Sequence, residues 1–171
     1  GCNNAYSLSP NHPIDSRENL YGAWALDWKL NELQSSALES LATLSQIRSN
    51  YLIDATEEFF TGDLDQKSLR KDIAWFQSDG SEMAEQGWLD PQLRYLGFAI
   101  DARDAQGLLV AINGGASELE FKLPGSSWGN SYRSIFDSGQ SLSDFAPLLK
   151  KPDDTFSIKA LTLQIWLINR S

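Results

Sequence analysis

Three short stretches of the sequence place tryptophan close to a carboxylate, and this pairing could support recognition of a sugar. They are GAWALDW at 22–28, KDIAWF at 71–76 and GWLDP at 87–91. In sugar sites an aromatic face stacks on the C–H groups of the ring, while carboxylates accept hydrogen bonds from hydroxyl groups. In the first stretch, Asp27 lies close to two tryptophans, Trp24 and Trp28.

A structural role is the competing interpretation of each pair, because tryptophan is most often an anchor of a core or an interface. A glycosidase also needs two carboxyl groups about 5–9 Å apart, and the sequence alone gives no such separation. Trp75 lies in a predicted strand and should belong to the core. Trp88 lies between Gly87 and the turn-forming pair Asp90-Pro91, so we expect it at the surface as a candidate sugar contact.

Phosphate and metal sites find little support in the sequence. GSSWGNS at 125–131 contains glycines but neither a lysine nor a following helix, so it does not read as a phosphate cradle. SDGSE at 78–82 lacks the repeated ligands of a calcium loop, and both stretches are predicted turns. One cysteine, Cys2, and one histidine, His12, cannot form a disulfide or a closed zinc site. We expect no metal and no cofactor.

Composition and charge narrow the classes of partner. The chain has 171 residues, of which 42% are hydrophobic and 22% charged, as in ordinary globular proteins. Its apolar runs are far shorter than the roughly 20 residues that cross a bilayer, so we expect no membrane partner. A net charge of −9 without a basic cluster argues against nucleic acid. The cysteine content fits a reducing or a disulfide-free secreted compartment, and we expect a cytoplasmic protein.

The first 50 residues predict a loop followed by one helix. Residues 1–30 show no apolar period, whereas apolar residues recur every three or four positions over 31–50, which is typical of an amphipathic helix. Asn31 and Gln34 form a plausible capping pair. The apolar stripe must pack on the sheet that follows or on a domain outside this sequence. The stripe consists of Leu33, Ala37, Leu41, Leu44 and Ile47.

The rest of the chain predicts strands. In ELEFKL at 118–123 apolar and charged residues alternate, as they do in a strand with one buried face. Four further stretches also read as strands: RYLGFAIDA at 94–102, GLLVAING at 107–114, SYRSIFDSG at 131–139 and FSIKALTLQIWLI at 156–168. The first two should be joined by a turn around Asp104 and Gly107. Short strands with turns rich in Gly, Asp and Ser indicate a mainly β fold, an antiparallel sandwich.

Taken together, these segments resemble the C-terminal part of a glycogen-debranching or isoamylase-type enzyme of the alpha-amylase superfamily. The matching pieces are GCNNAY, ALDW, FFTGD, KDIAWFQSDGSEMAEQGWLDP, LGFAID, LLVAING, FKLP and FDSG, in the order that family uses. The long block from Lys71 to Pro91 is the most specific. The sequence departs from the family at Cys2, which replaces an asparagine, and at the end of the helix, where QIRSNYLID replaces an arginine-rich segment with His-Pro.

This resemblance implies a division of the chain and a function for its parent. Residues 1–51 would be the end of a (β/α)8 barrel, a loop and the last helix, and 52–171 a C-terminal β-sandwich that stabilises the barrel. The parent enzyme would hydrolyse alpha-1,6 branch linkages of glycogen or a related alpha-glucan by a retaining two-carboxylate mechanism. Its partners would be the upstream barrel and the branched glucan. The catalytic residues would lie upstream, so this chain would contain none and be inactive alone.

The resemblance also places the first residues near substrate. Asn3, Asn4 and Tyr6 would lie on the rim of the barrel cleft, where amides can bond sugar hydroxyls and the tyrosine ring can stack. Alternatively, the two asparagines only hold the loop through bonds to its backbone. GCNNAYSLSP is thus expected to be a severed loop rather than a lipidated N-terminus.

Two other functions stay open on the sequence alone. One is a stand-alone carbohydrate-binding module, which six tryptophans and the exposed position expected for Trp88 suggest. The other is a structural or oligomerisation domain, which would use the helix stripe at Leu33, Leu41 and Leu44 if that stripe is exposed.

Overall fold

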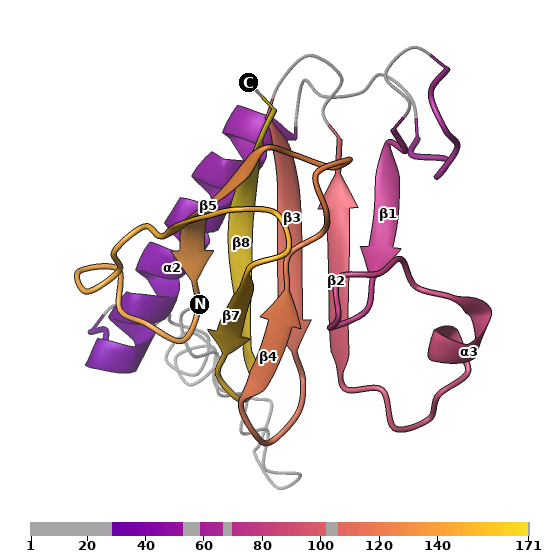
Figure 1. Cartoon of the computed structure of the whole chain (residues 1–171). Helices are drawn as coiled ribbons and strands as arrows, with labels where there is room; N and C mark the ends of the chain where they lie inside the picture. Colours follow the sequence, from indigo (N-terminus) through magenta and orange to yellow (C-terminus); the bar gives the residue numbers. More distant parts are fainter. Residues whose placement is uncertain (1–28, 53–58, 67–69, 102–105, 171) are drawn as a thin grey trace, which may run out of the picture. The chain divides into compact units, whose positions relative to one another are not determined.

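The computed structural model describes residues 29–52, 59–66, 70–101 and 106–170 of the chain (Figure 1). Contacts divide the chain into two compact units, Gly1–Thr43 and Leu44–Ser171. The strands and the candidate site belong to the second unit, which is therefore described by itself.

Helix α2, Glu32–Tyr51, confirms the predicted helix and its cap. The Asn31 side chain accepts a hydrogen bond from the Gln34 backbone N–H at 2.9 Å, and the Gln34 side chain accepts one from the Asn31 N–H at 3.0 Å. This reciprocal pair satisfies two backbone donors that a helix start leaves unpaired. The cap thus fixes where the helix begins.

Two antiparallel sheets form the body and confirm the predicted mainly β sandwich. The larger sheet has the order β1-β2-β3-β8-β5-β6, and the smaller contains β4 and β7 (Figure 1). FSIKALTLQIWLI therefore forms two strands in different sheets, which separate at Leu161, where φ is 56°. The elements are β1 Ile73–Phe76, the short helix α3 Glu85–Trp88, β2 Tyr95–Ile100, β3 Gly107–Asn113, β4 Leu119–Lys122, β5 Ser131–Asp137, β6 Leu149–Lys150, β7 Thr155–Ile158 and β8 Thr162–Asn169.

The main core lies between the two sheets. Phe121 of β4 and Phe156 of β7 face inward from the small sheet, and Trp166 of β8 meets Phe156 with ring centroids 4.6 Å apart. Trp166 is fully buried. Phe121 and Leu123 are buried as the alternation in ELEFKL predicts, because successive strand residues point to opposite faces.

A second apolar cluster covers the other face of the large sheet. Ile47 of α2 packs there with Leu108 of β3, Phe136 of β5 and Leu167 of β8, and Leu44 lies against the same cluster. From Leu44 onward the helix therefore packs on the sheet, which was one of the two partners that the sequence allowed. The helix side chains Leu33, Leu38 and Leu41, which belong to the first unit, are exposed.

The prediction that Trp75 belongs to the core is wrong. Its neighbours Ala74 and Phe76 face the core between the sheets, so the alternation of the strand turns Trp75 to the opposite face, where it is 37% exposed. No described residue of β1 belongs to the cluster around Ile47. The strand was predicted correctly, but the sequence did not show which of its two faces is covered.

The contact between the sheets at Gly97 generates a stability prediction. A Cβ atom added there would come within 2.5 Å of Phe121 Cζ and 3.1 Å of Phe76 Cβ. Since overpacking a core costs about 1–3 kcal/mol, we expect Gly97→Ala to lower the free energy of unfolding by about 2 kcal/mol, measured by urea denaturation. Gly125→Ala is the control, because its Cβ would meet only Asp153 Oδ2, at 3.9 Å. Equal stability of the two variants would contradict the packing described.

Candidate functional site

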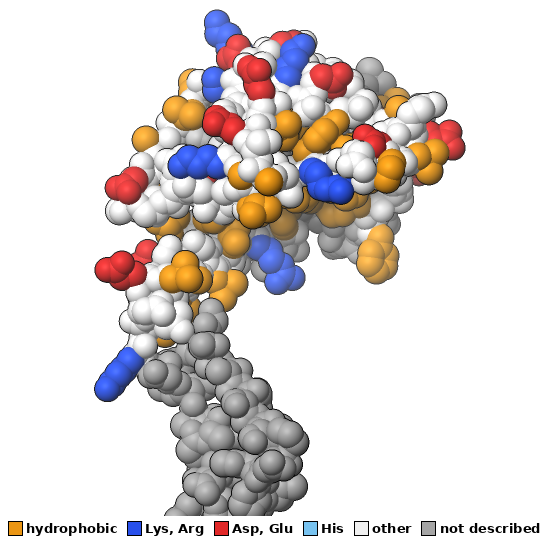
Figure 2. All heavy atoms as spheres, turned by 90° about the horizontal axis from the view of Figure 1, so that it is seen from below, with side chains coloured by type: hydrophobic (Ala, Val, Ile, Leu, Met, Phe, Trp, Pro, Cys, Tyr) orange, Lys and Arg blue, Asp and Glu red, His pale blue; other side chains and the backbone are white. Residues whose placement is uncertain are grey.

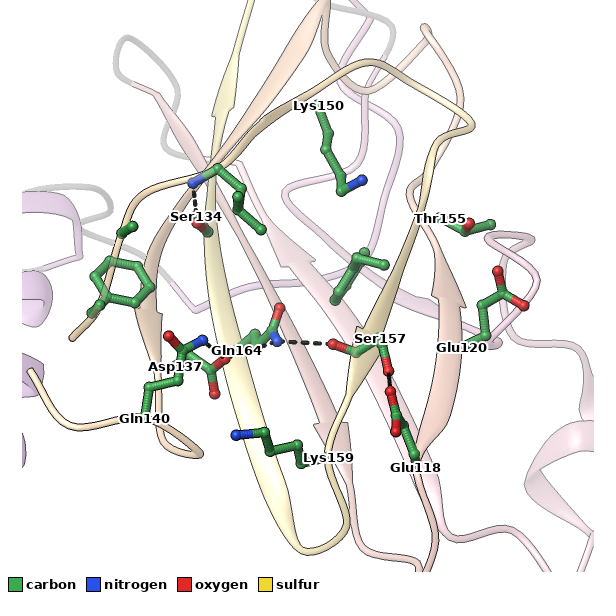
Figure 3. A pocket seen from close by; sticks show the side chains of 14 residues that line it. Glu118, Glu120, Ser134, Asp137, Gln140, Lys150, Thr155, Ser157, Lys159 and Gln164 are labelled. Atoms are coloured by element: carbon green, nitrogen blue, oxygen red, sulfur yellow. Dashed lines mark hydrogen bonds between the residues drawn. The ribbon is translucent and has the colours of Figure 1, made fainter.

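An open groove of about 750 Å³ lies between strand β7 and the β5–β6 edge of the large sheet (Figure 3). Its volume is in the range of small-molecule sites. Strands of both sheets and the 145–148 segment contribute to it. The lining side chains discussed below are Glu118, Glu120, Ser134, Asp137, Gln140, Phe145, Leu148, Lys150, Thr155, Phe156, Ser157, Lys159 and Gln164.

A row of hydrogen-bonded residues crosses the groove from β5 to Glu118, the residue before β4 (Figure 3). Gln140 Nε2 donates to Asp137 Oδ2 at 2.6 Å, and Gln164 Nε2 donates to the same oxygen at 3.1 Å. Gln164 Nε2 also donates to the Ser157 backbone carbonyl at 3.0 Å, and the Ser157 hydroxyl donates to Glu118. The row therefore links three strands and the turn after β5 by polar contacts.

Asp137 is held at the end of β5 by the local backbone. The register between β5 and β8 shifts between Ser134 and Phe136, so Asp137 lies opposite Gln164. Its second carboxylate oxygen accepts the Gly139 N–H at 2.8 Å, which closes the turn in FDSG. The carboxylate is buried and receives hydrogen bonds on both oxygens, as a buried charge requires.

The walls of the groove present charged side chains of both signs. Lys150 of β6 points into the groove from one side, and Lys159 lies at the other (Figure 3), where its ammonium donates to the Gly139 carbonyl at 3.1 Å. Glu120 of β4 forms part of the wall. Within the described residues, neither Lys150 nor Glu120 has a hydrogen-bond or ion-pair partner. Three carboxylates thus face two ammonium groups, which leaves the groove close to neutral.

A half-covered apolar face occupies the other side of the large sheet. Trp75, Phe98 and Val110 lie side by side on β1, β2 and β3 and continue the row that ends at Ile165 beneath α2. Phe98 and Val110 are only partly buried. Figure 2, which views the described body from below, shows apolar side chains exposed among charged ones at that end. A contiguous exposed apolar patch, such as the one that Trp75 and Phe98 form, is typical of an interaction surface.

Trp88 lies at the surface, as predicted, and is 50% exposed. Its ring meets Trp75 edge to face, with centroids 5.7 Å apart and an interplanar angle of 76°. Trp75 in turn contacts Phe98 at 5.3 Å. The helical turn α3 therefore carries Trp88 to the margin of the half-covered face, where half of its surface stays accessible.

The carboxylates beside these tryptophans hold the backbone in place. Asp90 Oδ1 accepts the Gln92 N–H at 2.8 Å. Asp72 accepts the N–H groups of Thr61 and Gly62, each at 2.8 Å, and that of Ile73 at 2.7 Å. Asp72 thereby ties FFTGD to the start of β1. Asp72 and Asp90 thus have the structural role that was the competing interpretation of the tryptophan–carboxylate pairs.

Several predicted residues lie outside the described part of the chain. Asn3, Asn4 and Tyr6 are among them, and so is the pairing of Asp27 with its two tryptophans, so their roles stay predictions. Among the described residues, no group of three or more His, Cys, Asp or Glu side chains could hold a metal ion. Of the helices in that part of the chain, none has the length and apolarity that crossing a bilayer requires.

Sequence reasoning did not identify the groove. FDSG was recognised as a motif, yet nothing near it indicated that Asp137 would meet Gln164, 27 positions further on. A polar residue inside the apolar run TLQIWLI was the available signal, because a glutamine in a central strand must find hydrogen-bond partners.

Comparison with known proteins identifies a relationship for most of the sandwich. A family model described as "Isoamylase, C-terminal" matches residues 72–162, more than half of the chain. Comparison with curated proteins gave no match. Among solved structures, the chain is similar to a GH30 endoxylanase from Clostridium papyrosolvens C71, with 19% identity and a TM-score of 0.37. That similarity covers 47% of this chain and 21% of the endoxylanase chain.

The hydrogen bonds to Asp72 generate a prediction on pH. Partial burial raises the pKa of Asp72, but the bonds from Thr61, Gly62 and Ile73 together outweigh burial and hold the pKa below its ordinary value of 3.8. A lowered pKa stabilises the fold above the unfolded-state value, and this contribution is lost as the pH falls through the folded-state pKa. We expect Asp72→Asn to cost about 1–2 kcal/mol at pH 7, and the difference from wild type to shrink below pH 3.8.

Urea denaturation of both proteins across pH 2–7 measures this difference. The pKa of Asp79 is also lowered, by the side-chain and backbone hydrogen bonds of Ser81, but Asp79 is present in both proteins and its contribution cancels. A difference that stays constant down to the lowest pH would contradict the role given to Asp72.

Proposed function

Because the chain belongs to the isoamylase C-terminal family, we propose that it is the C-terminal segment of a glycoside hydrolase that cleaves alpha-1,6 branch linkages of glycogen or a related alpha-glucan. In this proposal residues 1–51 end the catalytic barrel and residues 52–171 form the sandwich. The upstream barrel of the same protein is its partner, the branched glucan is its substrate, and it acts in the cytoplasm. The sandwich stabilises the barrel.

The observation that carries this role is the half-covered apolar face around Trp75, Phe98 and Val110. Helix α2 already covers the neighbouring part of the same face through Leu44 and Ile47, so the polypeptide enters the sandwich on this side. A catalytic domain joined to α2 is therefore the occupant that the chain connection favours. Covering a large apolar side chain contributes about 1.5–3 kcal/mol, so three such residues would supply a substantial part of the stability of an interface.

The carboxylates of the sandwich fit a structural rather than a catalytic part in the reaction. A retaining glycosidase needs two carboxyl groups about 5–5.5 Å apart across an accessible bond. Asp72 and Asp90 instead accept backbone N–H groups, and Asp137 is buried within the row of side chains in the groove. We therefore assign the nucleophile and the general acid to the barrel upstream.

A second candidate is a stand-alone carbohydrate-binding module. The accessible half of the Trp88 ring favours it, because an exposed indole can stack on a sugar. The edge-to-face contact with Trp75 presents one ring at an angle to the other, so the two do not form the flat strip that would hold consecutive sugar units. Trp88 alone would then carry the binding.

Hydrolysis assays test the proposed function. We expect the complete reading frame that contains this chain to release linear chains from branched alpha-glucan, and the 171-residue chain alone to release none. Reducing-end release from glycogen and from its limit dextrin measures both. Cleavage by the isolated chain that disappears on mutation of Asp27, Asp72 or Asp90 would contradict the assignment, and so would an upstream reading frame without barrel strands that carry two aspartates and a glutamate.

Substitution of Trp75 tests the docking face. In the isolated chain Trp75→Ser removes a partly exposed ring and should cost about 1–2 kcal/mol. In the complete protein the same change would open a buried interface and cost about 3–5 kcal/mol, seen as a larger fall in Tm. Leu149→Ser is the control, because Leu149 is exposed on β6 at the opposite edge of the sheet. Equal losses in the two proteins would rule out docking through this face.

A further inference from the structure

We propose that the groove between β7 and the β5–β6 edge binds a segment of an alpha-glucan chain. The chemistry of the groove indicates a neutral ligand rich in hydroxyl groups. The choice of an alpha-glucan among such ligands rests on the proposed function.

The groove interleaves hydrogen-bond donors and acceptors in the way that a sugar requires. Each sugar hydroxyl both donates and accepts, so a site that binds one offers both kinds of group side by side. Lys150 of β6 supplies a donor and Glu120 of β4 an acceptor, and Thr155 of β7 supplies a hydroxyl that can do both. None of these three side chains has a hydrogen-bond partner within the described residues. The amide of Gln164 lies at the centre of the groove, between Asp137 and Ser157 (Figure 3).

Apolar groups in the same groove can meet the C–H face of a sugar ring. Phe145 and Leu148 supply this apolar surface from the segment before β6; Phe145 is partly exposed and Leu148 is exposed. Phe156 lies behind them in the core, packed on Trp166, and its ring is buried. Stacking on such surface beside polar groups is the usual basis of sugar recognition.

The charge of the groove argues against an ionic ligand. Glu118, Glu120 and Asp137 are offset by Lys150 and Lys159, so neither a phosphate nor a cation would find a strong field of opposite sign. A neutral oligosaccharide is repelled neither by the carboxylates nor by the ammonium groups. Hydrogen bonds to charged groups are also among the stronger ones.

The free edge of β7 is protected against a peptide that would add as a further strand. Strand addition needs unpaired backbone N–H and C=O groups along the edge. The Ser157 carbonyl is already engaged by the Gln164 side chain at 3.0 Å, so a peptide would lose an acceptor in the middle of the edge. The groove therefore suits a ligand that bonds side chains rather than backbone.

Glucan in the groove is compatible with a domain on the half-covered face. Gln164 shares its side of β8 with Trp166, toward the small sheet, whereas Ile165 points to the side of α2. The groove and the half-covered face thus lie on opposite sides of the large sheet. Both can be occupied at once.

Titration of the 15N-labelled 171-residue chain with maltoheptaose, followed by NMR, tests the proposal. We expect shifts of the side-chain amide signals of Gln140 and Gln164 and of the backbone signals of 155–157. Lys150→Met should weaken binding about tenfold, since it removes a charged donor and keeps the aliphatic stem. Lys151→Met is the matched control, because Lys151 is the neighbouring residue and does not line the groove. Glu120→Gln should also weaken binding.

Four results would overturn the proposal: no shift at millimolar maltoheptaose, shifts confined to the Trp88 indole, equal shifts with inorganic phosphate, and equal effects of Lys150→Met and Lys151→Met. Binding of xylohexaose in place of maltoheptaose would overturn the alpha-glucan assignment while leaving a sugar site. The backbone amide spectrum of each variant verifies its fold. Loss of hydrolysis by the complete protein would bear on the proposed function alone, so the two failures are distinguishable.

Discussion

Strand β8 occupies the centre of the large sheet, between β3 and β5, and the rest of the structure depends on this insertion. Through β8 the residues near the end of the sequence join two sets of strands that otherwise share no pairing, β1-β2-β3 and β5-β6. Its side chains are buried on both faces, with Trp166 toward the small sheet and Leu167 toward α2. Without β8, the edges of β3 and β5 that now pair with it would keep unpaired backbone N–H and C=O groups in a buried position. Leaving such groups unpaired has a high cost in free energy.

The unequal size of the two sheets explains the groove. Two strands, β4 and β7, cannot cover six, so the inner face of the large sheet beyond β8 has no sheet above it. Polar residues replace apolar ones there: Ser134, Asp137 and Gln164 follow the core residues on the same face. Each is buried and hydrogen-bonded, which meets the cost of withdrawing a polar group from water. The groove is thus the polar continuation of the core.

The opposite face of the large sheet is also covered only in part. There α2 covers the β3–β8–β5 part through Ile47, and the β1–β2 part keeps Trp75 and Phe98 partly exposed. At one margin Asp101 joins Arg170 and Arg70 in a largely buried ion cluster, which ties the end of β2 to the end of β8. Paired charges are tolerated in such a position, whereas an unpaired one is very costly. These ion pairs therefore link two strands of the sheet beside the face that we assign to docking.

The sequence by itself indicated the long helix and most of the longer strands, because their signals are local. Apolar spacing and the Asn31–Gln34 pair set the helix, and alternation in ELEFKL set β4. Several segments together indicated the family, and the long contiguous block from Lys71 to Pro91 was the most specific of them. Only the tertiary structure decided which face of β1 is covered, and so where Trp75 lies. It alone brought Asp137 into contact with Gln164 and placed Lys150 and Glu120 around one groove, since such arrangements depend on strand order and register between segments far apart in the chain, which no local pattern encodes.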